Sequence, residues 1–544
     1  MIRSSSRFPT PPSMTSGSNS RRAGILVPLF SMPSARSWGI GEIGDLERMT
    51  AWLADSGQCL LQLLPITETL PHDPSPYGAL SGMAIDPQYI SLERVEDFAA
   101  IGGEQRLEPH LRAALDRVRS LPAIDYRAVR ELKQISLRRS FEHFVTTEWA
   151  TDSKRAASLK GFATEHAWWL DDYALFRALH ARHEERPWTE WPKPVRTRQP
   201  RALEAERLAL RNEILFRTYL QWIAGEQWQA ARKQMNSVSL FGDLPFMVNG
   251  DSADVWSHQD EFGDAGSVGV PPDAFSDIGQ DWGLPPYLWD VLRERDFDWL
   301  RSRARRMAQL FNGYRVDHVV GFYRTYVRPR GNGTGPGVFT PADEPSQLAL
   351  GERVMNVFRS TGVEIVAEDL GTVPDFVRAS LARAAIPGYK VFRWERHWHS
   401  PGQPFRDPRE YPSAAVATSG THDTEPMTVW WAQAPGEERR AVLEIPSIRE
   451  RLSEAERAQA IESSELSSTV RAALLESLFA SGANLLILPI QDAFGWSDRI
   501  NQPATIGDHN WTWRLPWPVD QISTEVEAAV VSAQLRKWSE RHGR

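Results

Sequence analysis

Short apolar runs recur along this chain, and helical patterns or long loops separate them. Within each run the apolar residues are mostly consecutive, which is typical of strands buried on both faces of a parallel sheet. Eight runs fit this description: Gly24–Phe30, Cys59–Pro65, Ser239–Phe246, Gly313–His318, Val363–Glu368, Tyr389–Trp394, Ala414–Ser419 and Asn484–Pro489. The clearest contains Leu485-Leu486-Ile487-Leu488, whereas Lys390 and Arg393 interrupt the sixth run. We expect each run to form one strand.

Helical patterns lie between several of these runs. Asp296–Phe311 repeats apolar residues with the period of a helix. In Pro374–Ala385, Pro374 suits the first turn and Thr372 is the expected N-cap. Eight strands with interleaved helices predict an α/β fold, namely a (β/α)8 or TIM barrel. A doubly wound open sheet is the alternative that the pattern leaves open.

Three stretches lie outside this repeating pattern. Residues 67–237 are mostly helical in pattern and predict a large helical insertion between strands 2 and 3 of a catalytic barrel that spans residues 23–544. Residues 247–295 are rich in Gly, Pro and Asp, and predict an active-site loop insertion with short helices over the barrel mouth. Residues 1–22 are rich in Ser, Pro and Arg without the apolar run of a secretory signal, so we expect a disordered leader.

The composition excludes several functional classes. The net charge is −8, from 62 basic and 70 acidic residues, whereas a nucleic-acid partner usually leaves a basic footprint. Cys59 is the single cysteine, so no disulfide forms within the chain and the cytoplasm is the expected location. No run is long and apolar enough for a membrane helix. The 22 tryptophans weakly favour a carbohydrate ligand, because flat aromatic faces stack on sugar rings.

Acidic residues follow three of the predicted strands. Asp317 ends the fourth run, Glu368 ends the fifth, and Asp423 follows the seventh. A single acid at such a place is most often solvated or caps a helix. In a barrel, however, the carboxyl ends of the strands surround the active site. We therefore expect the three acids at one rim.

Arg315 precedes Asp317 by two residues, so their side chains would share one side of a strand. The guanidinium would lower the pKa of Asp317, either as a structural ion pair or in a catalytic site. A retaining enzyme of glycosidic bonds needs a charged nucleophile and a protonated acid about 5–5.5 Å apart. The charge of Asp317 would help Glu368 to keep its proton, and Asp423 would stabilise a cationic transition state.

Longer motifs make the interpretation specific. They include Gly24-Ile25-Leu26-Val27-Pro28-Leu29-Phe30-Ser31, Trp38-Gly39-Ile40-Gly41, Ser75-Pro76-Tyr77, Gly242-Asp243-Leu244-Pro245, Asp251-Ser252-Ala253-Asp254-Val255-Trp256, Gly269-Val270-Pro271-Pro272-Asp273 and Gly279-Gln280-Asp281-Trp282-Gly283. Through these motifs, from about Gly24 to Arg514, the chain resembles the 4-α-glucanotransferases (amylomaltases or disproportionating enzymes) of glycoside hydrolase family 77.

The resemblance implies a role for each matching residue. Asp317 is similar to the nucleophile of the family, Glu368 to its general acid/base and Asp423 to its transition-state stabiliser. The matching sugar-binding positions are Tyr77, Asp243, Arg315 and His422; Asp273, Gln280 and Trp282 match the loop that lines the acceptor side, and Asn501 is a further sugar-contact candidate for which a role in a turn is equally compatible. The implied substrates are α-1,4-glucans and glucose, with no nucleic acid and no membrane as partner.

The chain departs from the family pattern at three places. It has Asp86-Pro87 where Asn-Pro is common, Pro503-Ala504-Thr505 where Pro-Gly-Thr is common, and Thr424-Glu425-Pro426 where Asn-Asp-Thr is common. The resemblance therefore leaves the outer sugar subsites undefined.

Two other motifs carry no cofactor signal. The Gly-rich stretch Gly331–Gly337 lacks the lysine of a phosphate-binding loop and is expected as a surface loop. His397 and His399 lack the spacing and partners of a metal site. We expect neither cofactor nor metal.

Two alternatives to a transferase remain. An α-amylase-type hydrolase would use the same three acids but pass the sugar to water, because water exclusion and acceptor binding decide that outcome. A non-catalytic glucan-binding protein would keep the barrel without turnover.

Overall fold

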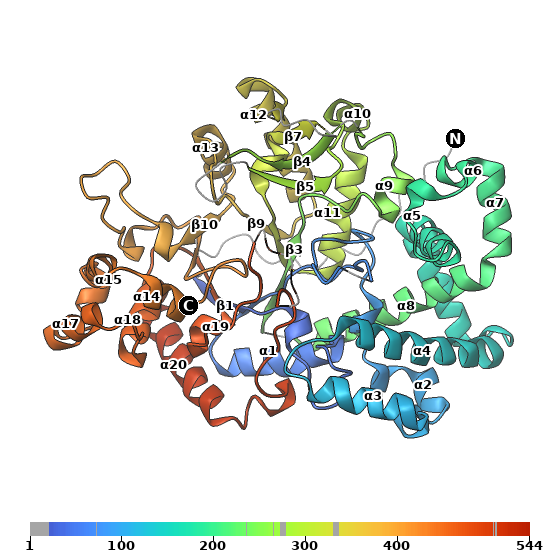
Figure 1. The fold of residues 1–544 in the computed structure, drawn as a ribbon, viewed down its shortest axis with the longest axis horizontal. Coiled ribbons are helices and arrows are strands. Elements are labelled where there is room, and N and C mark those ends of the chain that lie inside the picture. Colours follow the sequence, from blue (N-terminus) through green and yellow to red (C-terminus); the bar gives the residue numbers. More distant parts are fainter. Residues whose placement is uncertain are drawn as a thin grey trace.

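The computed structural model describes residues 21–544 except 72, 236, 265, 273–278, 330–336, 504, 506 and 508. Its centre is a closed barrel of eight parallel strands surrounded by helices (Figure 1). The strands, in their order around the barrel, are β1 (Arg22–Leu26), β12 (Leu485–Pro489), β11 (Ala415–Thr418), β10 (Gly388–Val391), β9 (Glu364–Ala367), β6 (Gly313–Val316), β3 (Ser239–Leu244) and β2 (Leu60–Gln62). The predicted (β/α)8 barrel is confirmed, and the open sheet is wrong.

The strands are shorter than the apolar runs that predicted them, so the acids at the ends of two runs lie just beyond the strands. β6 ends at Val316 and β9 ends at Ala367, and these two residues pair with each other. The next residue along each strand is an acid, so Asp317 and Glu368 leave the barrel side by side at its carboxyl end. On the other side of β6, Asp243 of β3 pairs with Arg315. The register thus brings four charged residues to one part of the rim.

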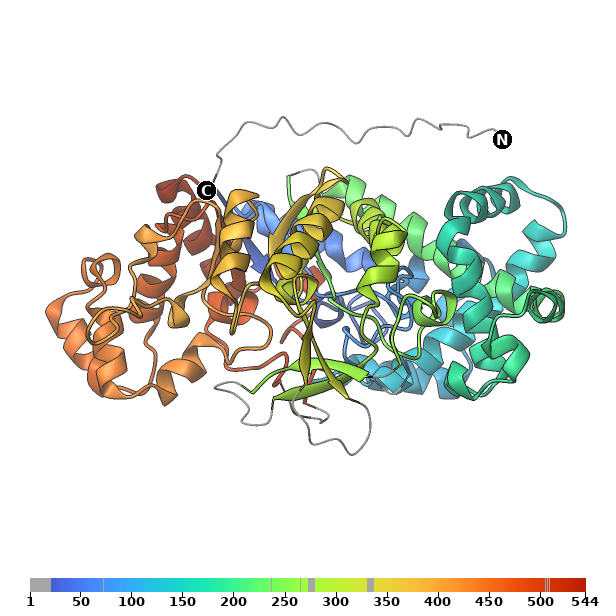
Figure 2. The ribbon, with the colours of Figure 1, turned by 90° about the horizontal axis from the view of Figure 1, so that it is seen from above.

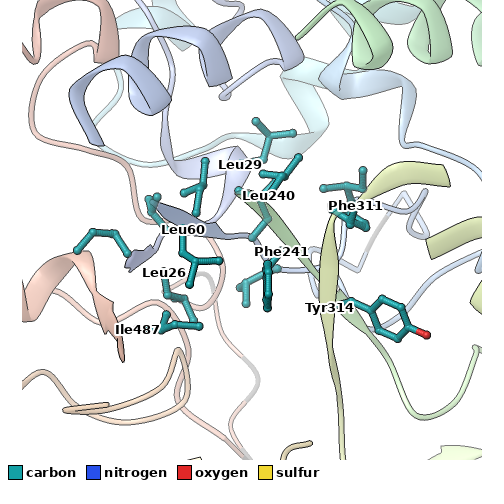
Figure 3. Close-up of a cluster of buried hydrophobic side chains, with 14 of the residues drawn as sticks. Leu26, Leu29, Leu60, Leu240, Phe241, Phe311, Tyr314 and Ile487 are labelled. Carbon is teal, nitrogen blue, oxygen red and sulfur yellow. The ribbon is translucent and has the colours of Figure 1, made fainter. Parts of the chain in front are cut away.

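Neighbouring strands bury their side chains in one continuous core. Figure 3 shows side chains from different strands in contact, among them Leu60, Leu240 and Ile487. Close approach of strands β1 and β2 requires a glycine, because a Cβ on Gly24 would lie 2.3 Å from the carbonyl oxygen of Leu60.

Both predicted helices are present, as α11 (Asp298–Leu310) and α13 (Asp375–Arg383). The predicted N-cap of α13 is wrong. The backbone of Pro374 is extended, with ψ of 148°, so Pro374 itself occupies the N-cap position and supplies no side-chain hydrogen bond. Thr372 therefore lies two residues before the cap.

Two groups of helices flank the barrel at opposite ends of the molecule (Figure 2). Between β2 and β3 the chain forms α2 (Glu96–Ala100), α3 (Pro109–Ser120), α4 (Tyr126–Phe144), α5 (Lys154–Arg182), α6 (Lys193–Arg196), α7 (Pro200–Ala209) and α8 (Arg211–Gln234). Between β11 and β12 it forms α14 (Met427–Gln433), α15 (Gly436–Leu443), α16 (Pro446–Arg449), α17 (Glu454–Glu462) and α18 (Ser468–Phe479). The remaining longer helices are α1 (Leu46–Asp55), α12 (Glu344–Arg359) and α20 (Val526–His542). None of the helices in the described part of the chain is both long and apolar enough to cross a membrane.

A small antiparallel sheet follows the carboxyl ends of β3 and β6. Its strands, in their order across the sheet, are β5 (Gln280–Leu284), β4 (Gly266–Val270), β7 (Thr325–Pro329) and β8 (Val338–Thr340). The short helices α9 (Ala253–Ser257) and α10 (Trp289–Glu294) lie between β3 and β6 in the sequence, and α19 (Ile490–Phe494) follows β12. The sequence pattern predicted loops and short helices for residues 247–295, so β4 and β5 correct that expectation. β4 is glycine-rich, and it pairs with β7 more than fifty residues later, so no local pattern marked it.

The central strands should tolerate truncation poorly. Leu486 of β12 is fully buried, so Leu486→Ala should lower the free energy of unfolding by about 2–5 kcal/mol through lost burial and a cavity. Leu208→Ala on α7 is the matched control, because that side chain is 68% exposed and should change stability by less than about 0.5 kcal/mol. Urea unfolding of both variants measures the difference, and equal effects would contradict the burial argument.

Candidate active site

Arg315 connects three carboxyl groups at the mouth of the barrel. Its Nη1 donates to both oxygens of Asp243, at 2.9 and 2.8 Å. Its Nη2 lies 2.8 Å from Oδ1 of Asp317 and 3.7 Å from Oε2 of Glu368. Burial by itself would lower the pKa of Arg315, but Asp243 and Asp317 hold that pKa well above its usual range. The guanidinium is therefore a permanent positive charge among these acids.

The same contacts bound the separation of the two acids. Because Oδ1 of Asp317 and Oε2 of Glu368 both contact one nitrogen of Arg315, they lie no further apart than the sum of the two distances, about 6.5 Å. Enzymes that retain anomeric configuration hold their two carboxyl groups about 5–5.5 Å apart, whereas inverting enzymes need about 6.5–9.5 Å. The bound applies to one pair of carboxyl oxygens, and the retaining separation lies within it.

Main-chain groups hold Glu368, whose side chain is 12% exposed. Its Oε2 accepts a hydrogen bond from the backbone N–H of His318 at 2.8 Å, and its Oε1 accepts one from Leu370 at 2.9 Å. Burial raises the pKa of Glu368 to about 7; Arg315 opposes this increase, and the charge of Asp317 adds to it. The expected effect of Asp317 is present, but burial is the larger cause. Glu368 can therefore hold or release a proton near neutral pH.

His318 is a site residue that sequence analysis missed. Its backbone is left-handed, with φ of 43° and ψ of 53°, which costs a non-glycine residue on the order of 1 kcal/mol. This conformation aims its N–H at Glu368. Its ring lies between Trp282 and Phe246, with centroid distances of 4.9 and 5.6 Å. Burial lowers the pKa of His318 to about 4, so the ring is neutral at pH 7. Its position directly after Asp317 was the only signal in the sequence.

Asp423 lies on the loop after β11, next to the other acids. Its Oδ1 accepts a hydrogen bond from Nδ2 of Asn501 at 2.6 Å, and its Oδ2 lies 3.3 Å from Nε2 of His422. Burial acts to raise the pKa of Asp423, but His422 and Asn501 outweigh it and bring the pKa to about 2. This pKa keeps the carboxylate ionised at neutral pH, and 41% of the side chain is exposed to solvent.

Tyr77 joins these groups from the segment after β2. Its hydroxyl donates to Oδ2 of Asp243 at 2.8 Å and lies 3.1 Å from Nε2 of His422. The two rings stack, with centroids 5.5 Å apart. Burial and the charge of Asp243 raise the pKa of Tyr77 well above its usual range, so the hydroxyl keeps its proton. Tyr77 therefore links the loops after β2 and β11 to the carboxyl end of strand β3.

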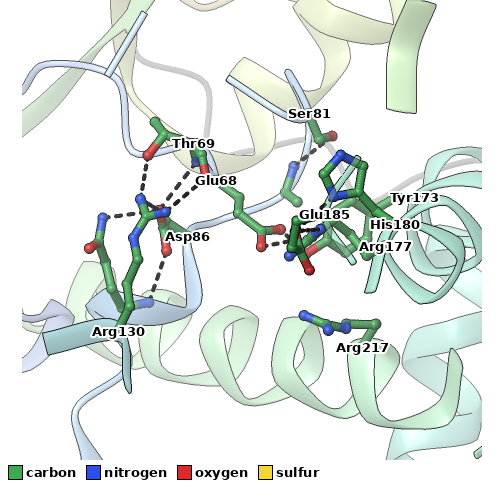
Figure 4. Close-up of polar contacts among 12 residues, drawn as sticks. Glu68, Thr69, Ser81, Asp86, Arg130, Tyr173, Arg177, His180, Glu185 and Arg217 are labelled. Carbon is green, nitrogen blue, oxygen red and sulfur yellow. Dashed lines mark hydrogen bonds and ion pairs between the residues drawn. The ribbon is translucent and has the colours of Figure 1, made fainter. Parts of the chain in front are cut away.

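Buried charges anchor the segment that carries Tyr77 (Figure 4). Near its start, Glu68 accepts hydrogen bonds from Arg177, at 3.0 Å, and from the hydroxyl of Tyr173, both on α5. Near its end, Asp86 lies 3.3 Å from Arg130 of α4 and accepts from the N–H of Gln88. Asp86, where this chain departs from the family pattern, thus anchors the segment that carries Tyr77.

Trp282 and Gln280 approach the site from β5. Nε1 of Trp282 donates to Oε1 of Gln280 at 3.2 Å, and the indole packs edge-on against His318. They therefore lie beside the Asp317 loop. Asp273 lies outside the described residues, and so do residues 331–336 of the Gly-rich stretch. Of the predicted site residues within the described part of the chain, all have partners in this cluster.

His397 and the departure at Glu425 have ion-pair partners of their own. His397 lies 3.2 Å from Glu410, and among the described residues no group of three or more His, Cys, Asp or Glu side chains could hold a metal ion. Glu425 contacts Arg393 at 2.6 Å. Ala504 lies outside the described residues.

Known proteins resemble this chain along most of its length. A family model described as 4-alpha-glucanotransferase, of glycoside hydrolase family 77, matches residues 27–520. The 4-alpha-glucanotransferase of Chlamydia pneumoniae is 30% identical over 93% of each chain, and that of Thermus thermophilus is 32% identical over 91% of this chain and 95% of the other. The structure of the amylomaltase from Streptococcus agalactiae in complex with acarbose superposes with a TM-score of 0.79 at 25% identity, covering 96% of this chain and 99% of that one.

The hydroxyl of Tyr77 should contribute measurably to stability. Tyr77→Phe removes its hydrogen bond to a charged carboxylate, and should lower the free energy of unfolding by about 1–3 kcal/mol. Tyr411→Phe is the control, because the buried hydroxyl of Tyr411 has no hydrogen-bond partner among the described residues and its loss should cost nothing. Urea unfolding compares the two, and a Tyr77→Phe variant as stable as Tyr411→Phe would contradict the assignment.

Proposed function

The chain belongs to the 4-alpha-glucanotransferases of glycoside hydrolase family 77, and we propose that the acids around Arg315 carry out this activity by a retaining double displacement. The substrates are α-1,4-glucans, and the acceptor is the 4-hydroxyl of another glucan or of glucose. The observation that carries the proposal is the contact of Arg315 with both Asp317 and Glu368, which limits the separation of two carboxyl oxygens to about 6.5 Å.

In the first step, a carboxylate oxygen of Asp317 attacks the anomeric carbon of the donor sugar. The glycosidic bond breaks, and Glu368 gives its proton to the leaving oxygen. The products are a glycosyl ester on Asp317 and a released glucan with a free 4-hydroxyl. The pKa of about 7 suits this role, because a substantial fraction of Glu368 is protonated at neutral pH.

In the second step, ionised Glu368 takes the proton from the 4-hydroxyl of the acceptor. The acceptor oxygen attacks the anomeric carbon, the ester bond breaks, and the carboxylate of Asp317 is regenerated. Glu368 is protonated again, so the cycle closes with no net change in the protein. Two inversions at one carbon retain its configuration.

Asp423 stabilises the positive charge that develops on the sugar in both steps. Its pKa of about 2 keeps it ionised throughout the working pH range. Tyr77, Asp243 and His422 form one hydrogen-bonded group beside it, and we propose that they hold the sugar at the cleavage point. Asn501, bound to Asp423, is part of the same proposal as a sugar contact.

The sheet over the mouth favours a sugar acceptor over water. Trp282 on β5 packs against His318, beside the nucleophile, and Gln280 accepts the indole N–H of Trp282. There they exclude water and offer an aromatic face and an amide to the acceptor. Asp273, on the same insertion, is assigned to the acceptor side by the family resemblance alone. A location in the cytoplasm, expected from the single cysteine, completes the proposal.

Maltotriose distinguishes transfer from hydrolysis. The purified protein should convert it to glucose and maltopentaose, followed by longer products, which chromatography separates. Asp317→Asn should reduce turnover at least about 10³-fold while leaving glucan binding intact, because it removes the nucleophile. Asp290→Asn, with an 87% exposed side chain, should behave like the wild type. Only glucose and maltose as products would indicate a hydrolase, and no turnover in the wild type a binding protein.

The pKa of Glu368 predicts the pH dependence. Above pH 7 the protonated acid is lost, so kcat/KM for maltotriose should fall about tenfold per pH unit. A maltosyl fluoride donor needs no proton on its leaving group, so its first step should lack this alkaline limb and should survive Glu368→Gln. The same alkaline limb for both donors would contradict the assignment of Glu368 as the acid.

A further inference from the structure

The carboxylate of Asp423 depends on contacts between the loops after β10, β11 and β12. Arg499, on the segment that follows β12 and the short helix α19, donates from Nη2 to the backbone carbonyl of Asp423 at 2.6 Å. Its Nε donates to the backbone carbonyl of Asn501 at 2.9 Å. Asn501 in turn donates to Asp423, and its N–H donates to the carbonyl of His422 at 3.2 Å. One guanidinium thus fixes both the catalytic loop and the amide that orients its carboxylate.

Glu425 connects this arrangement to the loop after β10. Arg393, directly after β10, donates from Nη1 to Oε1 of Glu425 at 2.6 Å and from Nη2 to the carbonyl oxygen of Glu425 at 3.0 Å. The other oxygen, Oε2, lies 3.8 Å from Nη1 of Arg499. Glu425 therefore lies between two arginines from neighbouring loops, two residues beyond Asp423. It also stands at one of the departures from the family pattern.

The charges make this arrangement sensitive to a change at Glu425. The side chain of Arg393 is only 4% exposed, and burial lowers its pKa, whereas Glu425 and Asp492 counteract that effect. Asp492 already accepts hydrogen bonds from Ser419 and from the N–H of Met427, at either end of the same loop. Loss of the charge on Glu425 would leave Arg393 and Arg499 without their shared carboxylate, and the backbone of the Asp423 loop between them would shift.

We infer that Arg499 and Glu425 are positioning residues of the reaction, acting on catalysis by fixing the carboxylate of Asp423. This inference rests on the proposed function. A transition-state stabiliser must keep its place to within about 0.5 Å, and a displacement of about 1 Å can cost on the order of 10²-fold in rate. The contacts of Arg499 described above are to two main-chain oxygens and one carboxylate, so its effect on the sugar is indirect.

Three single variants test the inference with maltotriose. Glu425→Gln removes the shared charge, and Arg499→Lys keeps a charge but loses the fork that reaches two carbonyl groups. Both should lower kcat about 10–100-fold and leave KM within about twofold, because the loss concerns the transition state. Glu438→Gln is the matched control: Glu438 pairs with Arg396 at 3.1 Å and is 28% exposed, like Glu425, but it lies on α15, outside the Asp423 loop.

A double-variant comparison separates positioning from a general structural role. In an Asp423→Asn background, measured with maltosyl fluoride as an activated donor, Glu425→Gln should cause no further loss of kcat, because its effect passes through Asp423. Glu425→Asp keeps the charge on a shorter side chain and should recover part of the activity. It replaces Glu425→Gln in the test if that variant folds poorly. Thermal unfolding of each variant shows that it is folded.

Three results would overturn the inference while the wild type still makes maltopentaose. The first is a rise in KM at unchanged kcat, which would indicate direct contact with the sugar. The second is that Glu425→Gln and Arg499→Lys are as active as Glu438→Gln. The third is that the loss of kcat caused by Glu425→Gln adds to the loss caused by Asp423→Asn. A wild type that makes no longer products would instead refute the proposed function itself, and with it the premise of the inference.

Discussion

The whole site depends on one buried positive charge. Arg315 is only 5% exposed, and three carboxyl groups would repel one another at this separation without it. Because the guanidinium is planar and offers several N–H groups in fixed directions, it can bind Asp243 through one nitrogen and hold Asp317 near Glu368 through another. The arginine therefore sets both the spacing of the two acids and the distribution of their charge.

The environment then gives similar carboxyl groups different states. Glu368 is buried against main-chain N–H groups and titrates near 7, whereas Asp423, with a neighbouring imidazole and amide, stays ionised down to a pH of about 2. A left-handed residue, His318, supplies one of the N–H groups that hold Glu368. Local backbone strain at this point is compensated by the packing of its ring against Trp282 and Phe246.

Charged anchors outside the strands keep the rim in place. The Tyr77 segment is attached to the flanking helices through Glu68 and Asp86, both buried with arginine partners. On the opposite side of the site, Arg393 and Arg499 hold the loop of Asp423. A parallel barrel fixes where each loop begins and ends, but not the path of the loop between these points. The loops that hold catalytic residues therefore need such charged anchors to keep a single conformation.

Much of this protein could be predicted from local patterns in its sequence. Runs of consecutive apolar residues predicted all eight strands, because burial on both faces of a sheet shows in neighbouring residues. The positions of Asp317 and Glu368 at the ends of two runs predicted them as site residues, because the carboxyl ends of barrel strands surround the active site. No local pattern predicted the sheet that contains β4 and β5, because its strands are short and β4 pairs with a distant segment.

Other features were decided only by the tertiary structure. The contact of Tyr77 with Asp243 and His422 joins residues that are 166 and 345 positions apart. Likewise, the left-handed backbone of His318 has no glycine to mark it in the sequence. The physical reason is the same in each case. Apolar periodicity reports whether a residue is buried, whereas the identity of its polar partner depends on which loops the closed barrel brings to the same rim.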